Sequence, residues 1–382
     1  MSWNATTLSI LLLGIFGSAS YAPLHSAPTP QVAEDDLLTV GVRVFDPGSP
    51  KKSRFLAGNE RVNLGVRRSE AAFVAVSLMR TLQWTGSFGL VRMVPRESKT
   101  VDLMVTGRIH HSSGRRLVVD LEVADATGRR WLDRRYKSKA DDLTYAAVFL
   151  NEREPFQDLY DRFAADLVQA QNRIGLEHLE ELRRVAELSF AAQLAPGIFG
   201  DYLRVDRKGR LDLERLPSRD DPMLTRVRKI QTRDEYFLDL LTERFEDFYL
   251  AMVEPYDEFR SASYEAEIAL RNARAQANLA NVRPLFGPRN DSPVHVRHRS
   301  KKEQYFRRQA AASARYLEDI SQVFALEIDP LRIELDGEVI RFTGSIEEQY
   351  EQWQKLLEQI FETETGLSTN DFVSQRDLAT RH

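Results

Sequence analysis

The spacing of apolar side chains changes twice along this chain, and each spacing limits what the segment can form. In residues 117–123 apolar and polar side chains alternate, which is typical of a strand with one buried face. From about residue 140 to 325 the apolar residues recur every three or four positions, as on one side of a helix. After Pro330 the alternation returns. The pattern predicts an α+β fold with an N-terminal βαββββ sheet domain, a central α-helical bundle and a C-terminal ββα element.

The N-terminal sheet domain is predicted to span residues 37–138. Its strand-like runs lie at 37–45, 88–94, 101–111, 115–124 and 129–136. Ser69 precedes a helical stretch at 70–85, and Gly86 suits the position after the helix end. We expect this helix to pack on one face of a half-buried antiparallel sheet. The glycines of Ser113-Gly114 and Thr127-Gly128 are expected to provide positive φ in tight hairpin turns.

The helical domain is predicted at residues 139–328, with five or six helices. Thr232-Arg233-Asp234-Glu235 has the form of a capping box and predicts a helix start there. In residues 256–282 alanines recur at helical spacing, which would let a second helix, expected at 303–324, approach closely.

The C-terminal element at 329–366 is predicted as a hairpin through Asp336-Gly337 followed by a helix that Ser345 caps. It is too small to be stable alone, so it should dock on the helices or complete the first sheet. A polar tail would follow at 367–382.

The N-terminus resembles an export signal. Residues 8–16 are mostly apolar and small residues follow, which predicts a signal-like segment at 1–22 and a linker at 23–36. The processing site would lie at Ser18, Ser20 or Ala22. The first 22 residues contain no basic side chain, so a buried N-terminal helix is the alternative. Ile15 to Ser18 also resembles a bacterial lipoprotein signal in which serine replaces the lipidated cysteine.

Three short motifs in residues 37–138 connect the chain to a known group. They are Phe88-Gly89-Leu90-Val91, the run from Val101 to Gly107, and Val123-Ala124-Asp125-Ala126-Thr127-Gly128. With the preceding strand and helix they resemble the N-terminal domain of the TolB and CsgG group of bacterial envelope proteins. The resemblance covers about a hundred of 382 residues. It implies a periplasmic assembly or interaction domain and carries no catalytic residues.

The composition excludes several chemistries. The chain has no cysteine, so disulfides, thiolate metal sites and a cysteine nucleophile are excluded. It has 53 basic and 57 acidic residues, a net charge of −4, without the global basic field that favours nucleic-acid binding. No phosphate-loop, dinucleotide-binding, serine-hydrolase or zinc-protease motif is present, and we expect no cofactor and no metal. His295 and His298 lack a third ligand nearby in the sequence.

Charge is nevertheless uneven along the chain. Residues 233–258 carry nine acids and two arginines, whereas 289–308 carry seven basic and two acidic residues. Arg297, Arg299, Lys301 and Lys302 are therefore candidates for contact with an anionic partner. The favoured alternative is a basic linker that pairs with the acidic helix of the same chain or is solvated. The pairs Asp234/Glu235, Glu246/Asp247 and Asp257/Glu258 are interpreted as solvated helix residues.

The leading functional hypothesis is an exported, non-enzymatic accessory or scaffold protein of the cell envelope that binds a protein partner. Peripheral contact with the membrane or with peptidoglycan would fit the same location. The alternatives are a carboxylate-dependent glycan hydrolase acting on peptidoglycan and an anion-binding adaptor that uses residues 297–302.

Overall fold

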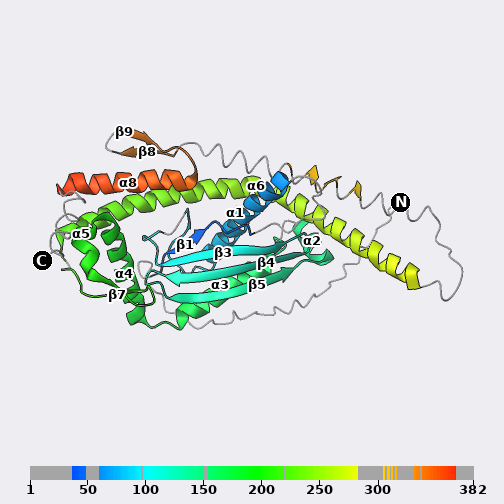
Figure 1. Cartoon of the computed structure of the whole chain (residues 1–382), viewed down its shortest axis with the longest axis horizontal. Coiled ribbons are helices and arrows are strands. Elements are labelled where there is room, and N and C mark those ends of the chain that lie inside the picture. The colour runs from blue at the N-terminus through cyan, green and yellow to red at the C-terminus, as the bar shows by residue number, and fades with distance from the viewer. Residues whose placement is uncertain are drawn as a thin grey trace, which may run out of the picture.

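A computed structural model describes residues 37–48, 60–95, 98–149, 154–218, 220–282, 331–335 and 338–366, with a few residues between 304 and 315. The predicted signal segment, linker and polar tail lie outside these residues. So do the processing positions Ser18, Ser20 and Ala22, the histidines 295 and 298, the Asp336-Gly337 turn, and the basic side chains Arg297, Arg299, Lys301 and Lys302. The α+β fold class is confirmed (Figure 1).

The N-terminal part is a five-stranded sheet with the strand order β2-β1-β3-β4-β5. The strands are β1 (Val40–Arg43), β2 (Val91–Val94), β3 (Leu103–Ser112), β4 (Arg116–Asp125) and β5 (Arg130–Lys139). The expectation of an antiparallel sheet is right for β3, β4 and β5 but wrong for β1, which pairs in parallel with both β2 and β3. The reason is the helical crossover between β1 and β2, since such a connection joins parallel strands.

Helix α1 (Glu60–Trp84) provides that crossover and lies behind the sheet (Figure 1). It begins ten residues before the predicted start at Glu70 and ends as predicted, with Gly86 at a φ of 60°. Helix α3 (Gln157–Asn172) lies beside α1 against β5. The face that the two helices cover carries apolar side chains, including those of the predicted alternation at 117–123. They are Val40, Val42, Leu103, Val105, Ile109, Leu117, Val119, Leu121 and Val123, each at most 2% exposed.

The two hairpin glycines have different roles. Gly128 has a φ of 82°, as predicted for the turn between β4 and β5. Gly114, between β3 and β4, does not have positive φ. A Cβ there would lie 2.2 Å from the backbone nitrogen of Tyr264 and 2.6 Å from the carbonyl oxygen of Arg260. Glycine is therefore needed at position 114 because the backbone of a distant helix passes directly over the turn.

That helix is α6 (Pro222–Val282), whose 61 residues give a length of about 90 Å. It runs along the body and then projects from it (Figure 1). The predicted helix start at Thr232 is wrong, because the helix is already three turns long there, and residues 256–282 continue the same helix. Pro255 lies inside it, where proline removes one backbone hydrogen bond.

The remaining helical segments connect the sheet to α6. They are α2 (Asp142–Phe149), α4 (Leu176–Leu194), α5 (Pro196–Phe199) and the 3₁₀ turn η2 (Gly200–Tyr202). A short hairpin follows, with β6 (Leu203–Val205) paired to β7 (Leu211–Leu213). None of the helices in the described part of the chain is long and apolar enough to span a membrane.

The C-terminal element consists of β8 (Arg332–Leu335), β9 (Glu338–Arg341) and α8 (Ile346–Thr365). The predicted capping box of Ser345 with Glu348 is confirmed. The hairpin forms its own two-stranded sheet, so the element docks on the helices instead of completing the first sheet. Trp353 stacks on Phe237 of α6 with a ring separation of 5.2 Å. All these elements contribute to one continuous hydrophobic core.

Candidate functional site

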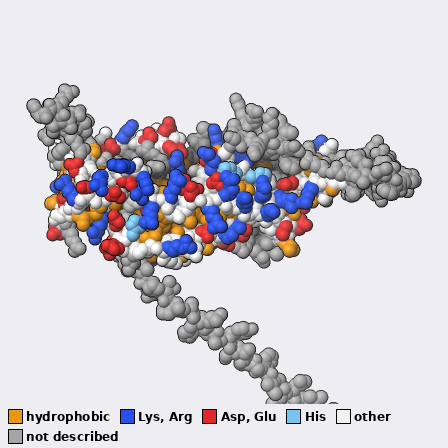
Figure 2. All heavy atoms as spheres, turned by 60° about the horizontal axis from the view of Figure 1, so that its bottom comes forward, with side chains coloured by type: hydrophobic (Ala, Val, Ile, Leu, Met, Phe, Trp, Pro, Cys, Tyr) orange, Lys and Arg blue, Asp and Glu red, His pale blue; other side chains and the backbone are white. Residues whose placement is uncertain are grey.

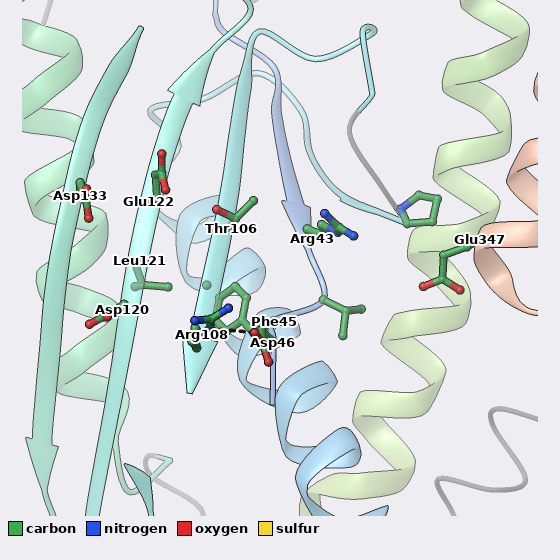
Figure 3. Close-up of a pocket in the computed structure, with 13 residues that line it drawn as sticks. Arg43, Phe45, Asp46, Thr106, Arg108, Asp120, Leu121, Glu122, Asp133 and Glu347 are labelled. Atoms are coloured by element: carbon green, nitrogen blue, oxygen red, sulfur yellow. Dashed lines mark hydrogen bonds and ion pairs between the residues drawn. The ribbon is translucent and has the colours of Figure 1, made fainter. Parts of the chain in front are cut away.

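The face of the sheet opposite α1 and α3 is hollowed at two places. The first hollow has a volume of about 750 Å³, and a second hollow of about 420 Å³ shares Thr106 and Glu122 with it. Thr106 on β3 and Glu122 on β4 are directly opposite in the sheet register. Because the two hollows share these residues, we call them together the groove. Figure 3 shows the first hollow, with β3 and β4 at its floor.

Charged side chains of opposite sign alternate across this groove. Asp46, which follows β1, accepts a hydrogen bond from Nε of Arg108 at 2.7 Å. On the other side of the floor, Asp120 accepts two hydrogen bonds from Arg135 of β5, at 2.6 and 2.8 Å, and also contacts His110. The resulting row, Asp46–Arg108–Asp120–Arg135, crosses four adjacent segments. We call it the charge ladder.

A second set of ion pairs lies beside the charge ladder. Arg130 of β5 lies 2.7 Å from the carboxylate of Glu122 and 3.3 Å from that of Asp133. At the far wall of the groove, Arg43 from β1 and Glu347 from the first turn of α8 contribute further charges (Figure 3). The groove therefore joins the sheet to the C-terminal element.

The pKa values in the charge ladder are those of stable carboxylate ions. Hydrogen bonding to Arg135 lowers the pKa of Asp120 to about 2. A hydrogen bond from the backbone of Gly48, with help from Arg108, lowers the pKa of Asp46. Both groups are ionised near neutral pH and cannot donate a proton to a substrate there. A glycan hydrolase needs one carboxyl group with a raised pKa as its general acid.

Burial raises the pKa of Asp102, which lines the second hollow. Other carboxyl groups with raised pKa lie outside the groove. Burial raises the pKa of Glu154 to about 8 and that of Asp234 to about 6. Asp234 accepts hydrogen bonds from Nε1 of Trp353 at 3.0 Å and from the hydroxyl of Tyr350 at 3.2 Å. The interpretation of Asp234 as a solvated residue is wrong, because its side chain is fully buried and attaches α8 to α6. Asp234 is buried because α8 packs over it. The residues next to Asp234 in the sequence do not indicate this contact.

A second buried polar cluster attaches α6 to the sheet. Arg260, which is fully buried, donates hydrogen bonds to the hydroxyl of Tyr256 and to the carbonyl of Ser113. Its guanidinium also lies 3.4 Å from the carboxylate of Glu70 on α1. This cluster lies at the turn where Gly114 contacts α6. It holds three elements together and has no access to the groove.

The two aspartates in the motifs that resemble TolB and CsgG domains have structural roles. Asp102 accepts hydrogen bonds from the backbone nitrogen of Thr39 at 2.8 Å and from its hydroxyl at 2.9 Å, which joins the starts of β1 and β3. Asp125 accepts hydrogen bonds from the backbone of Thr127 and Arg129 and from Nε1 of Trp131, which orders the β4–β5 turn. Both residues build the sheet that carries the groove.

The other candidate residues do not converge on a site. Glu246 pairs with Arg80 of α1, while Asp247 beside it is exposed, so they face different surroundings. His178 lies 3.4 Å from Glu181 and 3.7 Å from Asp125. In the described ranges, no group of three or more metal-ligating side chains is placed to hold a metal ion.

The sequence does not reveal the charge ladder. Asp46 and Arg108 are 62 positions apart in the sequence. The alternation in β4 correctly assigned Asp120 and Glu122 to the outer face, which was the available signal. Their cross-strand partners depend on the register of β3, β4 and β5, which cannot be predicted from the sequence.

Comparisons of the chain with protein-family models, with curated proteins and with solved structures found no match.

Proposed function

We propose that this protein is an exported, non-enzymatic accessory or scaffold protein of the bacterial cell envelope that binds a protein partner on the open face of its sheet. The observation that carries the proposal is the groove. Its floor is lined by carboxylates already bound to arginines, an arrangement suited to recognition by complementary charge. The signal-like N-terminus and the resemblance to TolB and CsgG domains support the location.

The groove offers little support for the glycan-hydrolase alternative. Asp46 and Asp120 in the groove have lowered pKa values, while the general acid of such an enzyme requires a raised one. Burial raises the pKa of Asp102 at the second hollow, but both the backbone nitrogen and the hydroxyl of Thr39 donate hydrogen bonds to its carboxylate. Glu154, whose pKa is raised to about 8, lies outside the groove and accepts a hydrogen bond from the backbone of Phe156 at 2.7 Å. Binding is therefore the function that the geometry favours.

Site-specific photo-crosslinking tests the proposal. A photoreactive amino acid replaces Thr106 in the groove of the full-length chain, expressed in bacteria, and a second variant carries it at exposed Lys208 as a matched control. We expect a discrete adduct with an envelope protein from position 106 and none from position 208. The same cells are fractionated, and we expect the protein in the periplasm or envelope.

Two results would overturn the proposal. One is a cytoplasmic protein with an uncut N-terminus. The other is peptidoglycan hydrolysis by the purified protein that Glu246→Gln or Asp247→Asn abolishes, since this would establish the enzyme alternative.

A further inference from the structure

The open face of the sheet ends in a basic surface at the β3–β4 hairpin. Arg116 of β4 and Lys139 of β5 are directly opposite in the register, and Lys137 projects from the same face two residues before Lys139. All three residues are exposed. We call them the basic end. Basic side chains are more prominent than acidic ones on the side of the molecule that carries β5 (Figure 2).

The basic end differs from the charge ladder because no described carboxylate pairs with its cations. Arg108, Arg130 and Arg135 each form an ion pair within the face. Within the described part of the chain, no ion pair involves the side chains of Arg116, Lys137 or Lys139. Two cations directly opposite on neighbouring strands repel each other and destabilise the sheet. The repulsion between Arg116 and Lys139 therefore destabilises the sheet here, whereas the Asp120–Arg135 ion pair of the same face avoids it.

His111 lies close to the basic end, and its pKa responds to the positive charge of Arg116 there. His111 is the register partner of Val118, which in turn is opposite Lys137. Burial, together with the positive charges of Arg116, Arg67 and Arg260, lowers the pKa of His111 to about 4. The imidazole is thus neutral at physiological pH, and positive charge dominates its surroundings.

We infer that the basic end, formed by Arg116, Lys137 and Lys139, binds an acidic segment of the protein partner in extended conformation. The inference rests on the proposed function and names the chemistry of that partner. Lys137 and Lys139 are about 7 Å apart along the strand, and Arg116 lies about 5 Å across from Lys139. Acidic side chains at alternate positions of an extended chain have the same spacing, because every second side chain points to one side.

An extended polypeptide fits this surface better than an anionic membrane does. Asp141 and Asp142 follow Lys139 almost directly and are exposed. Asp120 lies one row back, bound to Arg135. A flat anionic surface would contact these carboxylates together with the cations, whereas a single extended chain can follow the strands and avoid them.

The test uses the full-length protein and two fluorescent peptides of identical composition. One carries glutamate at alternate positions separated by serine, and the other carries its glutamates in one block. Binding is measured by fluorescence anisotropy at low ionic strength for the wild type, for Lys137→Glu/Lys139→Glu, and for the control Arg207→Glu/Lys208→Glu in the β6–β7 turn. Circular dichroism verifies that all three are folded.

We expect the wild type to bind the alternating peptide at least threefold more tightly than the block peptide. Lys137→Glu/Lys139→Glu should weaken binding at least tenfold, while the control should stay within twofold of the wild type. Equal binding by wild type and Lys137→Glu/Lys139→Glu would overturn the inference. So would wild-type binding to vesicles of anionic lipid without binding to either peptide.

The failure of this inference can be told apart from failure of the proposed function. A Thr106 crosslink that forms equally in Lys137→Glu/Lys139→Glu, together with unchanged peptide binding, would overturn only the inference. Absence of that crosslink from the wild type would overturn the proposed function whatever the peptides do.

Discussion

The two faces of the five-stranded sheet come from the same strands and have opposite properties. The face toward α1 and α3 is apolar and almost completely buried. The other face carries the charge ladder and the groove. Alternate residues of one strand therefore have separate roles, one set in folding and the other at the surface. The covered side chains determine how the protein folds, while the open ones can vary with whatever binds there.

The strongest test of this comparison substitutes neighbours on β4. Leu121→Ala removes a side chain that is 1% exposed, and we expect a loss of about 2–5 kcal/mol in the free energy of unfolding. Glu122→Ala on the open face should cost no more than about 1 kcal/mol. Urea denaturation measures both. Similar losses for the two variants would contradict the division between the faces.

Aspartates that are covered and aspartates that are open should respond oppositely to pH. Burial raises the pKa of Asp234 to about 6 in the folded protein, from a usual value of 3.8. The associated stability is therefore present below about pH 3.8 and lost as the pH rises through 6. At one pKa unit per 1.4 kcal/mol, the loss is up to about 3 kcal/mol.

Asp234→Asn tests this expectation, because an amide oxygen can accept the hydrogen bonds from Trp353 and Tyr350 without a charge to bury. Relative to the wild type, the variant should gain stability between pH 4.5 and 8 in urea denaturation. Asp247→Asn, at an exposed position, is the matched control and should show no such gain. A parallel pH dependence of Asp234→Asn and wild type would contradict the prediction.

The contact between the β3–β4 turn and α6 can be tested at Gly114. A methyl group at this position collides with the backbone of α6, so Gly114→Ala should cost about 1–3 kcal/mol. Gly175→Ala is the control, since nothing lies within 4 Å of a Cβ there, and its effect should stay within about 0.5 kcal/mol. Thermal unfolding of both variants decides whether α6 contacts this turn.

On the open face, the charge ladder should affect titration more than stability. Arg135→Ala removes the main cause of the lowered pKa of Asp120, which should rise from about 2 toward 3.8 in an NMR titration. In the wild type this pair stabilises the fold above about pH 3.8, and that contribution is lost as the pH falls through 2. Because both side chains are more than a third exposed and solvent screens the pair, removing it should change the stability at pH 7 very little. An unchanged pKa of Asp120 in Arg135→Ala would show that the two side chains do not form this ion pair.

The smallest effect is expected at the basic end and has the opposite sign. Lys139→Thr removes the repulsion with Arg116 and places a good strand former at the position, so it should stabilise the fold by about 0.2–1 kcal/mol. Lys208→Thr in the β6–β7 turn is the control, with no gain expected. Destabilisation by Lys139→Thr would show that this lysine has a structural role.

Much of the sheet could be predicted because its signals are local. The alternation of Leu117 to Val123, the αL glycines 86 and 128 and the capping box of Ser345 each involve only a few consecutive residues. The parallel pairing of β1 was missed because it depends on the path of α1. The continuous helix α6 was missed because a capping-box pattern at Thr232 and a proline at 255 both suggest interruptions that tertiary packing overrides.

The α+β class, the two faces of β4 and the capped C-terminal helix follow from the sequence alone, because side-chain periodicity and turn chemistry are properties of neighbouring residues. Only the tertiary structure decided which charges meet. Asp46 reaches Arg108, Asp234 becomes buried beneath Trp353, and Gly114 lies under α6 because separate elements pack at fixed register. Contacts between residues far apart in the chain depend on that packing, and the groove is built from such contacts.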